Sequence, residues 1–155
     1  MNGDGYMKRA LELARGSIDR GGGPFGAVIV RDGRIVAEGT NAVTSTPDPT
    51  AHAEVVAIRA AALSLGNFDL AGCEIYTSCE PCPMCLGAIY WARLDRIWFA
   101  ATRDDAAAAG FDDEFLYREI PKPLADRLIP TARLSLAETD AVFRAWADSP
   151  DKIPY

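Results

Sequence analysis

The first half of the chain alternates helical and strand-like patterns of apolar residues. Apolar residues between Met7 and Ile18 recur at helical spacing, which predicts an amphipathic helix that ends at the glycine-rich run 21–24. Two short apolar segments flank Asp32-Gly33, a dipeptide typical of hairpin turns. The predicted elements of this half are a helix around 7–18, strands at 25–31 and 34–38, a polar loop at 39–50 and a helix at 51–65 that Gly66 ends.

The second half repeats the alternation and becomes less regular towards the C-terminus. Pro83 stands near the first position of a helix, where its missing N–H costs nothing. The predicted elements are strands at 73–77 and 96–100, a helix at 83–92, a helical turn at 106–109, an irregular segment around 110–113, a further strand near 132–136, a final helix at 136–147 and a tail at 149–155. Strands that alternate with helices indicate an α/β fold with a mixed sheet covered by helices on both faces.

Composition narrows the class of protein. A chain of 155 residues fits one domain, 1–155, and 49% apolar residues suffice for a real core. No apolar run reaches the roughly 18 residues that a membrane span needs, and residues 1–20 lack the apolar stretch of a secretory signal. We therefore expect a cytoplasmic protein without a membrane partner. The net charge of −6 argues against a nucleic-acid partner and leaves small neutral substrates open.

The cysteines and the histidine are the candidate metal ligands. The chain has 4 cysteines, all between Cys73 and Cys85, and His52 is its 1 histidine. In a reducing compartment such a cluster indicates metal binding or catalysis more often than disulfides. Cys82 and Cys85 stand three residues apart at the start of a predicted helix, so they share a face, and the helix N-terminus favours the thiolate form. With His52 they would bind one zinc ion per chain and leave a position open for water.

Glu54 is the candidate acid–base group beside this metal. It follows His52 by two residues, about 200° around a helix axis, so both can serve one site only if the end of the helix points at it. Glu54 would then take a proton from the activated water, deliver it to the substrate ring and carry a second proton to the leaving amine. His-x-Glu followed by Pro-Cys-x-x-Cys is the known signature of zinc deaminases.

Two other metal sites fit parts of the same pattern, and both would make the protein a non-catalytic zinc or iron–sulfur binding module. A structural four-cysteine zinc site is one, although Cys79, Cys82 and Cys85 are crowded for its usual pair-and-pair arrangement. The same three cysteines match the start of a ferredoxin run, whose fourth cysteine would be expected near Ile89, where there is none. We favour the catalytic zinc, with Cys73 as a buried small hydrophobe and Cys79 as a structural residue.

The sequence resembles the cytidine deaminase superfamily and, within it, the bacterial guanine deaminases. The resemblance covers nearly the whole chain. The segments 23–28, 48–55 and 76–85 resemble the family's opening strand and its two metal-binding segments, and the segments 86–93 and 109–113 resemble the guanine branch. The family implies a three-layer α/β/α sandwich around a five-stranded mixed sheet, one zinc per chain and a homodimer. It also implies that a C-terminal segment, about 137–155, is exchanged between subunits.

The resemblance also implies a set of substrate-binding residues. Local sequence alone would give most of these residues structural roles. The set is Asn41, Asp113, Phe25, Ala53 and Tyr155. Asn41 would hydrogen-bond the base, Phe25 would flank it, and Asp113 would contact its polar edge or assist release of ammonia. Tyr155 would reach into the neighbouring subunit's site. Without the resemblance, Asn41 is a turn residue, Phe25 a core residue, Asp113 a helix cap and Tyr155 part of a frayed terminus.

The expected activity is hydrolysis of guanine to xanthine and ammonia, the reaction of a hydrolase acting on the C–N bond of a cyclic amidine. Guanosine, cytosine or an aminated triazine are alternative substrates for the same chemistry, because pocket shape decides between them. Adenosine in transfer RNA is a further alternative, since such deaminases share both metal segments. The net charge of −6 and the Phe111-Asp112-Asp113 segment count against that alternative.

Overall fold

The structure is a computed structural model that describes residues 2–155. The chain divides into two compact units, one ending at Asp113 and the other spanning Glu114–Tyr155. None of the helices within the described residues combines the length and apolarity that a membrane crossing requires.

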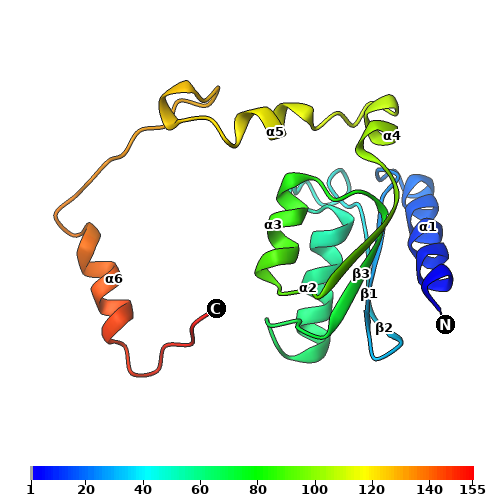
Figure 1. Ribbon diagram of the computed structural model, residues 1–155, viewed down its shortest axis with the longest axis horizontal. Coiled ribbons are helices and arrows are strands. Elements are labelled where there is room, and N and C mark those ends of the chain that lie inside the picture. The colour runs from blue at the N-terminus through cyan, green and yellow to red at the C-terminus, as the bar shows by residue number, and fades with distance from the viewer. Residues whose placement is uncertain (1) are drawn as a thin grey trace. The chain divides into compact units, whose positions relative to one another are not determined.

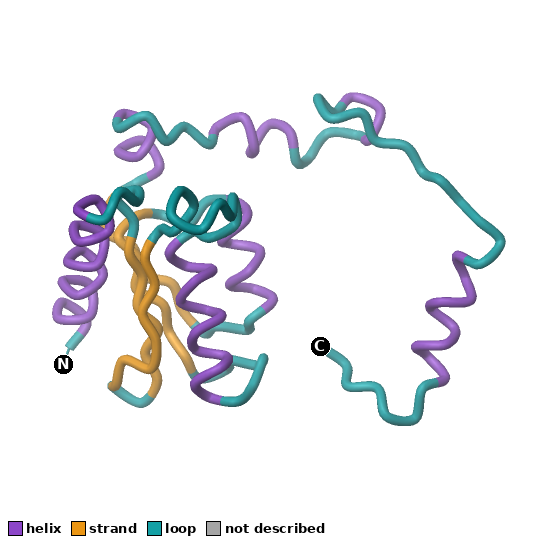
Figure 2. Tube along the Cα trace, turned by 180° about the vertical axis from the view of Figure 1, so that it is seen from behind, coloured by secondary structure: helices purple, strands orange, loops and turns teal. Residues whose placement is uncertain are grey.

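A mixed sheet organises the first unit, with strand order β2-β1-β3-β4. β1 pairs antiparallel with both β2 and β3, and β3 pairs parallel with β4. Helix α1 lies on one face of the sheet, and α2 and α3 lie on the other (Figures 1 and 2). The elements are α1 (Gly3–Asp19), β1 (Gly26–Arg31), β2 (Arg34–Thr40), α2 (Ala53–Leu65), β3 (Cys73–Cys79), α3 (Pro83–Trp91), β4 (Arg96–Ala101) and α4 (Arg103–Ala108).

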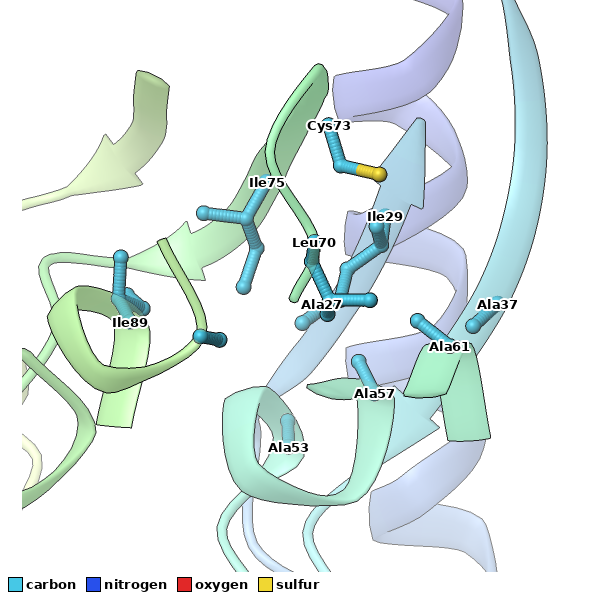
Figure 3. Packing of buried hydrophobic residues seen from close by; sticks show 11 residues of the cluster. Ala27, Ile29, Ala37, Ala53, Ala57, Ala61, Leu70, Cys73, Ile75 and Ile89 are labelled. Atoms are coloured by element: carbon cyan, nitrogen blue, oxygen red, sulfur yellow. The ribbon is translucent and has the colours of Figure 1, made fainter. Parts of the chain in front are cut away.

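Apolar side chains on both faces of the central strands form the core. Val28 and Val30 of β1 pack with Tyr6 and Tyr76 under α1. Ala27 and Ile29, on the opposite face of β1, belong to a larger cluster with α2 and α3, which Figure 3 shows. The small side chains of α2 in this cluster, Ala53, Ala57 and Ala61, let the helix lie close to the sheet. This close packing fixes the position of the first turn of α2.

Gly39 is the closest point of contact between α2 and the sheet. A Cβ atom at Gly39 would lie 2.2 Å from the carbonyl oxygen of Ala53 and 2.6 Å from the backbone nitrogen of Ala57. Because real Cβ atoms essentially never approach another atom within 3.0 Å, only glycine fits here while the helix keeps its place. The glycine therefore sets the depth at which α2 begins.

The second unit consists of short helices joined by irregular chain. They are α5 (Glu114–Glu119), the 3-10 helix η1 (Leu124–Asp126) and α6 (Thr139–Asp148). Within this unit Lys122 pairs with Glu119, whose carboxylate also accepts a bond from the backbone nitrogen of Leu128. Many of its apolar side chains are exposed, among them Leu128, Leu134, Val142 and Phe143.

The expected five-stranded sheet is wrong in its strand count, because the sheet of the described chain has four strands. The expected fifth strand at 132–136 is irregular, and Leu134 within it is exposed. Its alternating pattern is typical of a half-buried strand, but a strand forms only when its backbone finds a ladder partner. The described residues supply none for this segment, and the final helix begins at Thr139 rather than at 136.

Candidate active site

The two predicted metal segments begin two helices whose N-termini meet. His52 is the N-cap of α2 and Cys82 is the N-cap of α3, both with extended backbone conformations. Pro83 at the first turn of α3 fixes the φ angle there and removes a backbone N–H that would have had no helical partner. Caps lie at the very ends of helices, so residues 52 and 54 can face one point although they are far apart around the helix axis. The sequence prediction of converging helix ends is confirmed.

His52, Cys82 and Cys85 bring their ligand atoms together at this point. The His52 Nδ1 atom lies 3.6 Å from the Sγ atom of Cys82 and 3.5 Å from that of Cys85. All three ligand atoms lie within 4.8 Å of one another. A tetrahedral zinc with ordinary Zn–N and Zn–S bond lengths separates nitrogen and sulfur ligands by about 3.6 Å. The residues present therefore fit a zinc ion.

The charges at the cluster are strongly coupled. Hydrogen bonds from Cys85 and His52 lower the pKa of Cys82 to about 4, and the contact with Cys82 raises the pKa of Cys85. The neighbouring Cys82 also raises the pKa of His52. Cys82 is thus a thiolate at neutral pH, the form in which cysteine binds a metal.

Glu54 lies in the first turn of α2, beside the ligand cluster. It is buried, with 6% of its surface exposed, and burial raises its pKa above the ordinary range. The carboxyl group interacts with Cys85 by a hydrogen bond and with the charge of Cys82. A buried carboxyl that adjoins the metal ligands and faces a cavity is placed to hold or release a proton there.

A cavity of about 450 Å³ opens onto the cluster, within the range of small-molecule sites. Phe25, Asn41, Glu54 and Asp113, which the sequence motif or the family resemblance singled out, line it. Its walls also include residues that sequence reasoning did not assign to the site. These are Gly21, Gly22, Gly23, Val43, Thr44, Cys79, Glu80, Arg103, Ala106 and Phe111.

Asn41 is held by its backbone and by its side-chain oxygen. The Ser17 hydroxyl donates to the carbonyl of Asn41 at 3.2 Å, and the backbone nitrogen of Asn41 donates to Phe25 at 3.1 Å. The Oδ1 atom of Asn41 accepts from the backbone nitrogen of Val43 at 3.3 Å. Because Oδ1 is engaged in this way, the amide nitrogen is the donor that Asn41 can offer to a ligand in the cavity.

The aromatic wall of the cavity has two members. The rings of Phe25 and Phe111 meet edge to face, with centroids 4.9 Å apart. The sequence singled out the segment around Phe111, but its edge-to-face contact with Phe25 depends on the tertiary fold. Asp113 follows on the same segment, and burial raises its pKa.

The other residues considered in the sequence analysis lie in the core, in the second unit or beside the ligand cluster. Ala53 is fully buried in the core between His52 and Glu54, so only its backbone can face a ligand. Tyr155 ends the second unit and has an exposed side chain. Cys73 is buried in the core, as expected. The Cys79 thiol, also buried, donates to the carbonyl of Thr102 at 3.5 Å, and burial raises its pKa to about 11. Neither thiol belongs to the ligand cluster found among residues 2–155.

The sequence of this chain is similar to those of known deaminases. The family profile of the cytidine and deoxycytidylate deaminase zinc-binding region matches residues 2–101. The guanine deaminase of Bacillus subtilis is 55% identical over 156 residues, which cover 100% of both chains. A tRNA-specific adenosine deaminase of Aquifex aeolicus is 41% identical over 96 residues, covering 62% of this chain and 64% of its own.

Solved structures of guanine deaminases also resemble this chain. The crystal structure of the Bacillus subtilis guanine deaminase superposes with a TM-score of 0.97, covering 100% of this chain and 99% of its own. A guanine deaminase from Nitrosomonas europaea, 37% identical, superposes with a TM-score of 0.70 over 79% of this chain and 68% of its own. Both likenesses extend beyond the 62% of this chain that the adenosine deaminase matches.

Proposed function

We propose that this chain, which belongs to the cytidine and deoxycytidylate deaminase family, hydrolyses guanine to xanthine and ammonia. The observation that carries the proposal is the full-length likeness to the Bacillus subtilis guanine deaminase. The geometry agrees with it, because a zinc-binding cluster and a buried carboxyl adjoin a cavity of small-molecule size. The enzyme is thus a hydrolase acting on the exocyclic C–N bond of a purine base.

His52, Cys82 and Cys85 would hold one zinc ion per chain. A bound zinc ion supplies Lewis-acid activation, which lets water act as a nucleophile near neutral pH. The neutral imidazole and two thiolates leave room in a tetrahedral shell for one further ligand. Both helix N-termini point their positive ends at this region, which favours the negative charge of the thiolates.

Glu54 moves the protons of the reaction. Attack of water at C2 of guanine adds a C–O bond and places negative charge on the adjacent ring nitrogen. Glu54 takes the proton from the attacking water and delivers it to that nitrogen. It then carries the remaining proton of that water, now on the oxygen at C2, to the amino group, which leaves as ammonia when the C–N bond breaks and the C2 carbonyl forms. Its position beside Cys85 and on the cavity wall supports this role.

Asn41, Phe25, Ala53 and Asp113 would bind the base. The amide nitrogen of Asn41 would donate to a ring or exocyclic acceptor, and the backbone beside Ala53 would contact the reacting edge. Phe25, backed by Phe111, would lie against the purine ring. Asp113 would accept a hydrogen bond from a donor on the base, or assist the departure of ammonia.

The second unit would complete the site by exchange within a homodimer. We propose that a segment of about 137–155 docks on a partner subunit and that Tyr155 closes the partner's cavity. The apolar residues Val142, Phe143 and Trp146 of α6 are exposed, and burying them would offset the entropy cost of ordering the segment. This proposal concerns a protein partner only; nothing in it requires nucleic acid or a membrane.

Deamination of adenosine in transfer RNA is the main competing function. The adenosine deaminase of Aquifex aeolicus matches 62% of this chain, whereas the guanine deaminase matches all of it. The net charge of −6 also disfavours a polyanionic substrate. A free base therefore remains the better substrate class.

An ammonia-release panel tests the proposal. The zinc-loaded protein is assayed with guanine, guanosine, cytosine, adenosine and unmodified transfer RNA, and xanthine is identified by chromatography. We expect guanine to give the highest kcat/KM and transfer RNA to be inert. Faster turnover of guanosine than of guanine would contradict closure by Tyr155, and activity on transfer RNA alone would contradict the proposed function.

A further inference from the structure

Ser17 carries a buried hydroxyl group in the last turn of α1, with 1% of its surface exposed. A hydroxyl group that is buried without a hydrogen bond is costly, so its partner is informative. The Ser17 hydroxyl donates to the backbone carbonyl of Asn41 at 3.2 Å. Asn41 lines the cavity and belongs to the residues that would bind the base. Helix α1 therefore supports a base-binding residue through a buried polar contact.

Ser17 also contacts the glycine run that lines the cavity. The backbone nitrogen of Gly22 donates to the carbonyl of Ser17 at 2.8 Å. A Cβ atom at Gly22 would lie 2.4 Å from the hydroxyl oxygen of Ser17 and 2.6 Å from the carbonyl oxygen of Asn41. Because real Cβ atoms essentially never approach another atom within 3.0 Å, the backbone of Gly22 lies directly against both groups. The three residues thus form one close-packed contact at the end of α1.

The peptide group that joins Asn41 to Ala42 is held from two directions. Its carbonyl oxygen accepts the hydrogen bond from Ser17, and its nitrogen donates to the carbonyl of Ala51 at 2.9 Å. Ala51 directly precedes the candidate metal ligand His52. The bond from Ser17 and the bond to Ala51 together fix the tilt of this peptide group relative to the metal segment.

The side-chain amide of Asn41 depends on this backbone. Its Oδ1 atom accepts from the backbone nitrogen of Val43 at 3.3 Å, so the amide cannot turn by itself without losing that bond. A change in the tilt of the peptide group would therefore redirect the amide nitrogen, which is the donor available to a ligand. The hydrogen bond from Ser17 opposes such a change.

We propose that Ser17 is a positioning residue that directs the Asn41 amide towards the base and so sets the affinity for the substrate. The inference rests on the proposed function, because it assumes that Asn41 donates to a bound guanine. Ser17 acts through Asn41 and does not itself touch the base. An interaction that binds the ground state and the transition state equally changes KM and leaves kcat unchanged. Ser17 should accordingly affect substrate binding more than the chemical step.

A double-mutant cycle tests whether Ser17 acts through Asn41. The variants are Ser17→Ala, Asn41→Ala and the double variant, each examined for guanine kinetics, zinc content and Tm. Two residues that work as one unit have effects that do not add. Tyr6→Phe is the matched control, because the Tyr6 hydroxyl also projects from α1 to a backbone carbonyl, that of Gly33 in the hairpin, at 2.6 Å.

We expect Ser17→Ala to raise KM for guanine about 3- to 12-fold, the size of one hydrogen bond, and to change kcat by less than about twofold. Zinc content should be unchanged. In the Asn41→Ala background the same substitution should change KM by less than about twofold, and Tyr6→Phe should keep the KM of the wild type. A fall in kcat at constant KM, or an equal rise of KM in both backgrounds, would overturn the positioning role.

A measurement without substrate separates this inference from the proposed function. The side-chain amide resonances of Asn41 are recorded by NMR on the zinc-loaded protein and assigned by comparison with Asn41→Asp. Ser17→Ala should shift or broaden them, whereas Tyr6→Phe should leave them in place. Unchanged resonances in Ser17→Ala would overturn the inference. If the wild type releases no ammonia from guanine, the proposed function fails, and the resonances still decide whether Ser17 positions Asn41.

Discussion

Replacing Gly39 by alanine should push helix α2 away from the sheet where the helix carries the candidate catalytic groups. The new Cβ atom would start 2.2 Å from the carbonyl oxygen of Ala53 and would need at least 3.0 Å, so the backbone must move by about 0.8 Å. The contacted atoms belong to the helix backbone and cannot turn aside as a flexible side chain would. His52 and Glu54 flank Ala53 and would move with it.

The Gly39→Ala substitution should lower both the stability of the fold and the activity. Overpacking of this kind typically costs about 1 to 3 kcal/mol, which for a chain of this size lowers Tm by roughly 2 to 12 °C. A displacement near 1 Å of groups that position a reaction can lower the rate about 10²-fold. We therefore expect kcat/KM for guanine to fall by about two orders of magnitude, and zinc to be bound more weakly.

Gly87 provides the matched control. It lies in helix α3, where a Cβ atom would meet nothing within 4 Å. Alanine in a helix is favoured over glycine by up to about 1 kcal/mol, so Gly87→Ala should keep or raise Tm and leave activity unchanged. Thermal unfolding, zinc content and guanine turnover are measured on both variants. A Gly39→Ala protein with the Tm and kcat/KM of the wild type would refute the close-packing argument.

Three further predictions concern a metal ligand, the C-terminal tail and an ion pair of the first unit. Cys85→Ser should reduce zinc from near one per chain to a small fraction after dialysis against a mild chelator, and full retention of zinc would remove Cys85 from the ligand set. Deletion of residues 153–155 should leave zinc content and dimerisation intact but lower kcat/KM for guanine at least tenfold; a fully active truncated enzyme would exclude a role for Tyr155. Arg9 lowers the pKa of Glu38 below its ordinary 4.5, so their pairing stabilises the fold above that pH and is lost as pH falls through the lowered value. Arg9→Met should accordingly destabilise by at most about 1 kcal/mol at pH 7 and by less in acid, once Glu38 is protonated, and an equal effect at both pH values would show that packing, not charge, is involved.

The helices and strands of the first unit were predictable because their apolar patterns are regular and their ends carry strong signals. Pro83 marked the start of α3, Gly66 marked the end of α2, and Asp32-Gly33 marked the hairpin. The metal cluster was predictable for a similar reason, since a motif at fixed spacing places ligands by local geometry. The strand expected at 132–136 was wrong because strand formation depends on a pairing partner, which the local pattern does not specify.

The cavity wall was only partly predictable. Asn41 and Asp113 were expected from a family resemblance, whereas Glu80 lies in the connection between β3 and α3 and Arg103 begins α4 directly after β4. Nothing in the local sequence around Arg103 distinguishes it from an exposed helix residue. Its location depends on the parallel pairing of β3 with β4, which brings the ends of both strands to the same edge of the sheet.

The Glu54→Gln variant tests the central claim most directly, because it changes the proton-carrying group while keeping its size. Zinc content and guanine turnover are measured on the same preparation as the wild type. We expect about one zinc per chain in both proteins and a kcat that is about 10²- to 10⁴-fold lower in the variant than in the wild type. A variant that keeps zinc and turns over guanine at the wild-type rate would contradict the claim that Glu54 moves protons at a zinc site.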